Sequence, residues 1–133
     1  LCINDSKATS FDACLQSLSN YNKIYWIVGG LPKDKDKFYL EKVKKRIVKA
    51  YIIGKNISFF RKQIGKKIPF SVSYNIKNAI RKINKDLKFN HNEQKTILLS
   101  PAAASFDQFI NFENRGDFFK KQVIKKFKFK SNV

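Results

Sequence analysis

Several residue types are scarce or missing in this chain of 133 residues. There is no methionine, only one histidine, and only two cysteines, Cys2 and Cys14. Metal sites and thiol or imidazole nucleophiles need clusters of such residues, so the sequence offers no metal-ligand set and no complete catalytic arrangement. Because a complete reading frame begins with methionine, we expect the chain to be a fragment of a longer protein.

Long hydrophobic runs are also missing. The apolar stretches are only a handful of residues long, too short to cross a bilayer, and the chain does not open with a secretory signal. Hydrophobic residues nevertheless make up 43% of the chain and aromatic residues 14%. That composition excludes a disordered tail and is sufficient for one domain with a real core.

Acidic residues are few: there are 10, against 28 basic ones, and the formal net charge is +18. Such a charge is typical of nucleic-acid-binding proteins. However, only four basic residues are arginine, which groove-reading proteins favour, and the lysines spread over every helix-like segment. We therefore expect a solvated surface and no nucleic-acid partner. A stand-alone module that binds nucleic acid or an anionic metabolite through its lysines is the alternative.

What the sequence does contain is an alternation of strand-like and helix-like segments. Short apolar runs predict strands at residues 1–3, 24–28, 50–53, 69–72 (towards an edge) and 96–99. Apolar residues at helical spacing predict helices near 11–18, over 38–47, 57–64 and 76–83, and from Phe106 onward. The inward face of the last helix is expected to hold Phe118, Phe119, Val123, Ile124 and Phe127. The pattern predicts a single α/β domain over 1–133, Rossmann-like and doubly wound, with a mostly parallel sheet and helices on both faces.

Three of the predicted strands run into loops of small, hydroxyl or cationic residues. These loops are Asn4 to Thr9, Gly29 to Lys33 and Ser100 to Ser105. If the strands are parallel, the loops meet at one edge of the sheet, where open α/β sheets bind their ligands. Their lysines and hydroxyl groups would suit an anionic ligand.

Individual residues of these loops have competing interpretations. Thr9 and Asp12 fit a capping box, and Ser105 could likewise cap the last helix. Lys7 is different, because a cation just before a helix opposes the helix dipole unless an anion binds there. Lys33 could be one more lysine in a charged run.

Three motifs resemble the C-terminal domain of the Mur ligases. They are N-D-S-K-A-T at 4–9, G-G-x-x-K at 29–33 and L-L-S-P-A-x-A-S-x-D-Q-F-x-N-F-x-x-R-G at 98–116. The first loop lacks the histidine- or tyrosine-containing sequences of most branches and is similar to the branch that adds D-glutamate. It also argues against a folylpolyglutamate synthase. The chain departs from the family pattern at Leu31-Pro32 and at Ala103, where the family often has Asp-Gly and cysteine.

The resemblance implies an ATP-dependent ligase of peptidoglycan synthesis, cytoplasmic and monomeric. The full enzyme would convert the carboxylate of UDP-N-acetylmuramoyl-L-alanine into an acyl phosphate, which the amine of D-glutamate attacks. This domain would bind D-glutamate and close over ATP. ATP and Mg²⁺ would be held mainly by a central domain that this chain lacks, so the fragment would be inactive alone.

The resemblance also assigns roles to single residues. Thr9 and Lys33 would hold one glutamate carboxylate, and Ser105, with the backbone near Phe106 and Phe112, would hold the other. Nearer the nucleotide, Asp5 would approach the ATP ribose and Lys7 would face the phosphates or the developing intermediate.

Overall fold

The computed structural model describes residues 1–88 and 94–131, with side chains described up to 127. Strands and helices alternate along the chain: β1 Cys2–Asn4, α1 Phe11–Asn20, β2 Ile24–Gly29, the 3₁₀ turn η1 Lys44–Arg46, β3 Ile47–Ile53, α2 Ile57–Ile64, β4 Phe70–Tyr74, α3 Ile76–Leu87, β5 Thr96–Leu99 and α4 Phe112–Ser131. Within these residues no helix has the length and apolar character needed to cross a membrane.

The strands form one five-stranded sheet in the order β1-β5-β2-β3-β4, and every neighbouring pair is parallel. β4 lies at an edge, as its weak apolar pattern predicts. All residues of β2 and β5, near the centre, are buried, which is why these strands are apolar throughout instead of alternating. Because all strands are parallel, their carboxyl ends share one edge of the sheet. The predicted Rossmann-like, doubly wound class is confirmed.

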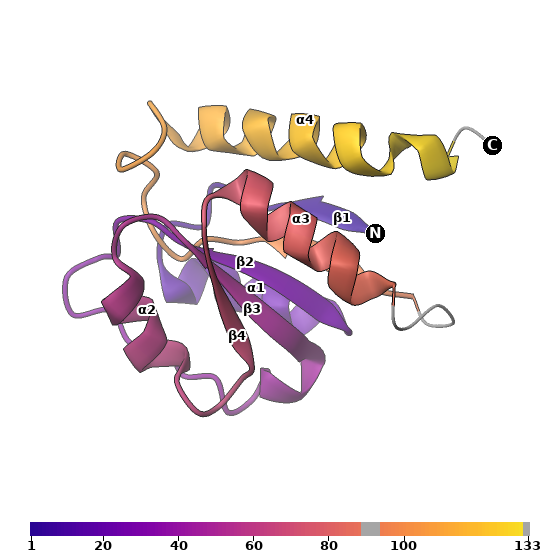
Figure 1. The fold of residues 1–133 in the computed structure, drawn as a ribbon. Helices are drawn as coiled ribbons and strands as arrows, with labels where there is room; N and C mark the ends of the chain where they lie inside the picture. Colours follow the sequence, from indigo (N-terminus) through magenta and orange to yellow (C-terminus); the bar gives the residue numbers. More distant parts are fainter. Residues whose placement is uncertain (89–93, 132–133) are drawn as a thin grey trace.

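Helices cover both faces of the sheet (Figure 1). α1 and α2 pack on one face, and α3 and α4 pack on the other. Alternate residues of β2 serve the two cores: Trp26 and Val28 point to the first face, and Tyr25 and Ile27 to the second. The single domain therefore has two hydrophobic layers with the sheet between them.

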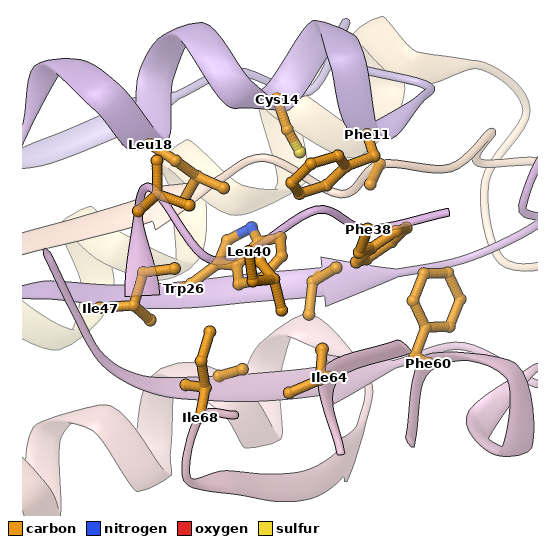
Figure 2. Packing of buried hydrophobic residues seen from close by; sticks show 14 of the residues in the cluster. Phe11, Cys14, Leu18, Trp26, Phe38, Leu40, Ile47, Phe60, Ile64 and Ile68 are labelled. Carbon is orange, nitrogen blue, oxygen red and sulfur yellow. The ribbon is translucent and has the colours of Figure 1, made fainter. Parts of the chain in front are cut away.

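Trp26 is the centre of the layer beneath α1. Figure 2 shows Phe11, Cys14 and Leu18 of α1 pointing toward it from one side. Phe38 stacks on Phe11 with ring centroids 4.7 Å apart. The indole N–H of Trp26 donates to the carbonyl of Ser100 at 2.7 Å, so its one polar atom is satisfied although the side chain is fully buried. This bond also fixes the first residue after β5.

The predicted helix over residues 38–47 is wrong. Phe38, Leu40 and Val43 are buried, whereas Tyr39 between them is 68% exposed, which is the alternation of an extended segment. The amide of Phe38 donates to Oε1 of Gln63 on α2, at 3.0 Å, instead of to a helical carbonyl. Only η1 is helical, and Ile47 already begins β3. The spacing of apolar residues in this segment also fits a helix, but its tertiary contacts with α2 and the core favour an extended chain.

The predicted start of the last helix at Phe106 is also wrong, since α4 begins at Phe112. The residues between cross the carboxyl ends of two strands instead. Oδ2 of Asp107 accepts from the amide of Lys55, which follows β3, and Nε2 of Gln108 donates to the carbonyl of Tyr74, the last residue of β4. Because these side chains bond to the backbone of distant segments, residues 106–111 form a series of turns.

The inward face of α4 is only partly as expected. Phe119 is buried, and Phe118, Val123 and Phe127 pack against the core beneath α3 and α4. Ile124 was expected to face inward, but it is 56% exposed. α4 lies against α3 and the sheet along a narrow stripe, and this stripe does not reach Ile124.

The two cysteines should differ sharply in reactivity. Cys14 is fully buried, and desolvation raises the pKa of its thiol to about 12, so about one thiol in ten thousand is ionised at pH 8. Cys2 is exposed, although partial desolvation raises the pKa of its thiol too. We expect an aromatic disulfide reagent at pH 8 to label one thiol in the native protein and the second only in denaturant. With Cys2→Ser, native labelling should vanish, and rapid labelling of Cys14 would contradict the described core.

Candidate functional site

The three loops that follow β1, β2 and β5 lie at the same edge of the sheet, because all strands are parallel. We call them the first loop (residues 5–10), the second loop (30–37) and the third loop (100–111). The expectation that segments far apart in the sequence meet at one edge is confirmed. Side-chain and backbone bonds connect each pair of loops.

Arg115 joins the first loop to the third. Its guanidinium donates from Nε to Oγ of Ser6 at 2.9 Å, from Nη2 to the carbonyl of Ser6 at 2.6 Å and from Nη1 to the carbonyl of Ala103 at 2.9 Å. The hydroxyl of Ser6 in turn donates to the carbonyl of Phe112 at 2.6 Å. One side chain at the start of α4 therefore holds the backbone of both loops.

The Arg115 guanidinium is only 1% exposed, and all three of its acceptors are uncharged. Desolvation lowers its pKa to about 10, although the charge of Asp107 acts in the opposite direction. A pKa near 10 leaves the group fully charged at neutral pH. The loops thus enclose a buried cation whose hydrogen bonds go to main-chain and hydroxyl oxygens.

The second loop is joined to the third through their backbones. Leu31 and Ala104 form an antiparallel bridge, in which each amide donates to the other carbonyl at 2.9 and 2.8 Å. Gly30 has a φ of 137°, and a Cβ there would collide with the carbonyl of Ala104, so glycine is required for this approach. The departure at Leu31-Pro32 is therefore compatible with an ordered second loop.

The first loop is joined to the second through Asp36. Its Oδ2 accepts from the amide of Phe11, the first residue of α1, at 3.0 Å. Asp36 also closes a turn, since its amide donates to the carbonyl of Lys33 at 3.1 Å. This carboxylate at a helix start is favourable for the helix dipole. The bond from Phe11 to Asp36 places the turn that carries Lys33 beside the start of α1. Thr9 lies two residues before Phe11.

The capping interpretations of Thr9 and Ser105 are both wrong. Ser10 is the N-cap of α1, its Oγ accepting from the amide of Ala13. Asn111, not Ser105, provides the first bond of α4: its Oδ1 accepts from the amide of Asn114 at 2.7 Å. Among the described residues, the side chains of Thr9, Lys7 and Lys33 have no hydrogen-bond or ionic partner. These groups are available to a ligand.

Ser105 is the most informative residue of the third loop. It is 2% exposed, yet its hydroxyl has no hydrogen-bond partner in the described part of the chain. A buried hydroxyl without a partner is costly, and native proteins keep few of them. The next residue in the chain, Phe106, is 69% exposed, so Ser105 lies just beneath the surface of the third loop.

Lys7 and Phe112 line a common cleft of about 240 Å³ between the first loop and the first turns of α4. Asn4, Ser6, Glu113, Gly116 and Asp117 complete its lining. A Cβ at Gly116 would lie 2.8 Å from Nδ2 of Asn4, so this glycine permits α4 to lie directly on the first loop. Thr9, Lys33, Ser105 and Phe106 do not line this cleft, and the predicted residues thus divide into two groups along the edge.

Asp5 is engaged within the protein. Its Oδ2 accepts hydrogen bonds from the hydroxyls of Ser17, at 2.9 Å, and Ser100, at 2.8 Å. The carboxylate thereby links the first loop, α1 and the start of the third loop. No cluster of three histidine, cysteine, aspartate or glutamate side chains that could hold a metal occurs among the described residues.

Sequence reasoning missed the residues that hold the loops together. Arg115, Ser6 and Asp36 have this role, and Asn111 begins α4. The signal for Arg115 was a single arginine next to a glycine at the end of the third motif. Nothing in the charged run 33–37 distinguishes Asp36 from Asp34 before its partner is known.

Arg115→Met should destabilise the protein by about 2–6 kcal/mol, because each of two buried carbonyls left without a donor costs about 1–3 kcal/mol. The substitution keeps the volume but removes the Arg115 donors from two carbonyls and from the Ser6 hydroxyl, which still donates to the carbonyl of Phe112. Arg61→Met is the matched control, because Arg61 is exposed and its side chain lies over the ring of Phe70 without a hydrogen bond or ion pair to any described residue. Urea unfolding measures both. Equal losses in the two variants would refute the bridging role of Arg115.

Three curated relatives illustrate what the chain is similar to. It is 42% identical over 121 residues to the UDP-N-acetylmuramoylalanine–D-glutamate ligase of Agrobacterium fabrum. It is 43% identical over 123 residues to the ligase of the same name from a Chelativorans species, and 42% identical over 125 residues to that of Brucella abortus. The matches cover 91%, 92% and 93% of this chain, but 26%, 26% and 27% of the relatives. No family model matches the chain.

The similarity covers 91–93% of the chain, at an identity far above chance for so long an alignment. The chain is therefore homologous to a segment of the UDP-N-acetylmuramoylalanine–D-glutamate ligases and spans about a quarter of their length.

Proposed function

We propose that this chain is the C-terminal, D-glutamate-adding domain of a ligase that joins D-glutamate to UDP-N-acetylmuramoyl-L-alanine in peptidoglycan synthesis. The observation that carries the proposal is the connection of the three motif-bearing loops at one edge of the sheet, through Arg115, Asp36 and the Leu31–Ala104 bridge. The homology to enzymes of this name supports it.

D-glutamate carries two carboxylates, so its site needs two separate groups of hydrogen-bond donors. Thr9 and Lys33 form the first group; their side chains are free of protein partners in the described residues, and the Asp36 turn brings their segments together. Ser105 provides the second, with the backbone at Phe106 and Phe112. The amide of Phe112 begins a helix, where N–H groups lack intrahelical acceptors and favour anions.

Lys7 lies on the nucleotide side of this site. It is exposed, lines the cleft next to Phe112 and has no carboxylate partner in the described residues. A cation there would attract phosphate or the acyl-phosphate group of the second substrate. Asp5, which we assign to the ribose, lies two residues before Lys7, and the bonds of its Oδ2 to Ser17 and Ser100 hold its carboxylate in one orientation.

The chemistry assigned to this domain is positioning. ATP supplies the phosphoryl group that activates the nucleotide substrate, and the amine of D-glutamate then displaces phosphate. Holding both carboxylates fixes the amine at the acyl carbon, which replaces an encounter in solution by an oriented contact. ATP and Mg²⁺ would be bound mainly by a central domain outside this chain, so we expect the chain alone to be inactive. We assign the enzyme to the cytoplasm, as a monomer.

Lys33→Ala in the full ligase should raise the KM for D-glutamate about ten- to hundredfold, the value of one charge-assisted hydrogen bond. The KM for ATP should change little. Lys37→Ala is the matched control, since Lys37 is exposed in the same loop and carries the same charge. Steady-state kinetics with each substrate varied in turn measure the effect. An unchanged KM for D-glutamate would remove Lys33 from the site.

Ser105→Ala separates ligand binding from structure. Because the hydroxyl is buried without a partner, its removal should leave the free energy of unfolding unchanged or raise it, while the KM for D-glutamate rises. Ser10→Ala is the contrast, because loss of an N-cap should cost about 1 kcal/mol and leave that KM unchanged. Denaturant unfolding and kinetics on the same preparations give both values. A destabilised Ser105→Ala with normal kinetics would assign the hydroxyl a purely structural role.

A further inference from the structure

A second concave site lies between α3 and α4, on the sheet face opposite α1 and α2. The two helices pack against each other, with α4 lying along α3 (Figure 1). The cleft between them has a volume of about 260 Å³ and is lined by Lys77, Asn78, Ile80, Arg81, Gln122, Lys125 and Lys126. None of these residues belongs to the three loops of the candidate site.

The charge of this cleft is uncompensated. Lys77 and Arg81 lie one turn apart on α3, and Lys125 and Lys126 face them from α4. All four are exposed, and none has an ion pair or hydrogen bond within the described residues. No carboxylate lines the cleft. The aspartate of α3, Asp86, is already bonded to Lys49 and Tyr51 of β3.

The remaining lining groups suit an oxyanion. Asn78 and Gln122 contribute amide N–H donors from the two helices, and the buried Ile80 forms an apolar floor. Lys77 and Asn78 are in the first turn of α3, where the helix dipole adds positive potential. Four cations held together without an anion repel one another, so binding of an anion relieves that repulsion.

We propose that this cleft binds a small, multiply charged anion of the oligophosphate class. Its volume of about 260 Å³ favours a compact ligand over a nucleic-acid duplex. The site does not depend on the D-glutamate assignment, because the two sets of residues do not overlap.

The test uses tripolyphosphate as the probe and titration calorimetry on the purified protein. The cleft variant is Lys77→Gln, Arg81→Gln and Lys125→Gln combined. The matched control is Lys42→Gln, Lys45→Gln and Lys66→Gln combined, which removes the same charge from exposed positions outside the cleft. Circular dichroism confirms that both variants are folded.

We expect the cleft variant to bind tripolyphosphate at least about tenfold more weakly than the unmodified protein and the control to change less than about threefold, with affinity falling as salt is raised. Equal weakening in both variants would mean attraction by net charge alone and would overturn the proposal. It would also be overturned by no binding to the unmodified protein, or by duplex DNA binding more tightly than tripolyphosphate through the same residues. The same three substitutions in the full ligase should leave the KM for D-glutamate unchanged, so failure of this proposal and failure of the D-glutamate assignment can be told apart.

Discussion

The candidate site depends on one buried cation. Arg115 is almost completely removed from solvent, and each of its three nitrogens donates one hydrogen bond, two to the hydroxyl and carbonyl of Ser6 and one to the carbonyl of Ala103. Burying a guanidinium is costly, and desolvation lowers its pKa accordingly. The acceptors are therefore held strongly in place, because releasing any one of them would leave the charge less well solvated. The first loop, the third loop and the start of α4 consequently keep one relative arrangement.

The third loop organises the rest of the edge. It pairs with the second loop through Ala104, crosses the ends of β3 and β4 through Asp107 and Gln108, and receives the first loop through Arg115. Polar side chains of this region such as Arg115, Asp36 and Asp107 bond within the protein. Four residues are exceptions. The hydroxyl of Ser105 is buried without a hydrogen-bond partner, and the side chains of Lys7, Thr9 and Lys33 form no hydrogen bond with any described residue. A ligand with two anionic ends would satisfy both kinds of exception.

The basic residues have three different situations in this fold. Arg115 is structural and buried, Lys7 and Lys33 lie at the carboxyl edge, and the cations of α3 and α4 surround a cleft on one face. Net charge alone does not distinguish among them. Burial, distance to acceptors and the absence of neighbouring carboxylates do, and these properties separate a structural cation from one that is available to an anion.

The sequence by itself determined the α/β class, the parallel sheet and the common edge of the three loops. An unbroken run of β-branched and aromatic residues such as Ile24–Val28 is typical of a buried strand, and β5 has the predicted bounds. The sequence-based prediction was wrong at residues 38–47 and 106–111, where the apolar spacing also fits a helix. In the first segment, the amide of Phe38 bonds to Gln63 instead of to a helical carbonyl. In the second, side chains bond to the backbone of Lys55 and Tyr74. Only the tertiary structure decided that Ser10 and not Thr9 caps α1, that Ser105 has no partner, and that Arg115 and Asp36 join the loops. The physical reason is that periodicity reports local burial, whereas hydrogen-bond satisfaction depends on groups brought together from far along the chain.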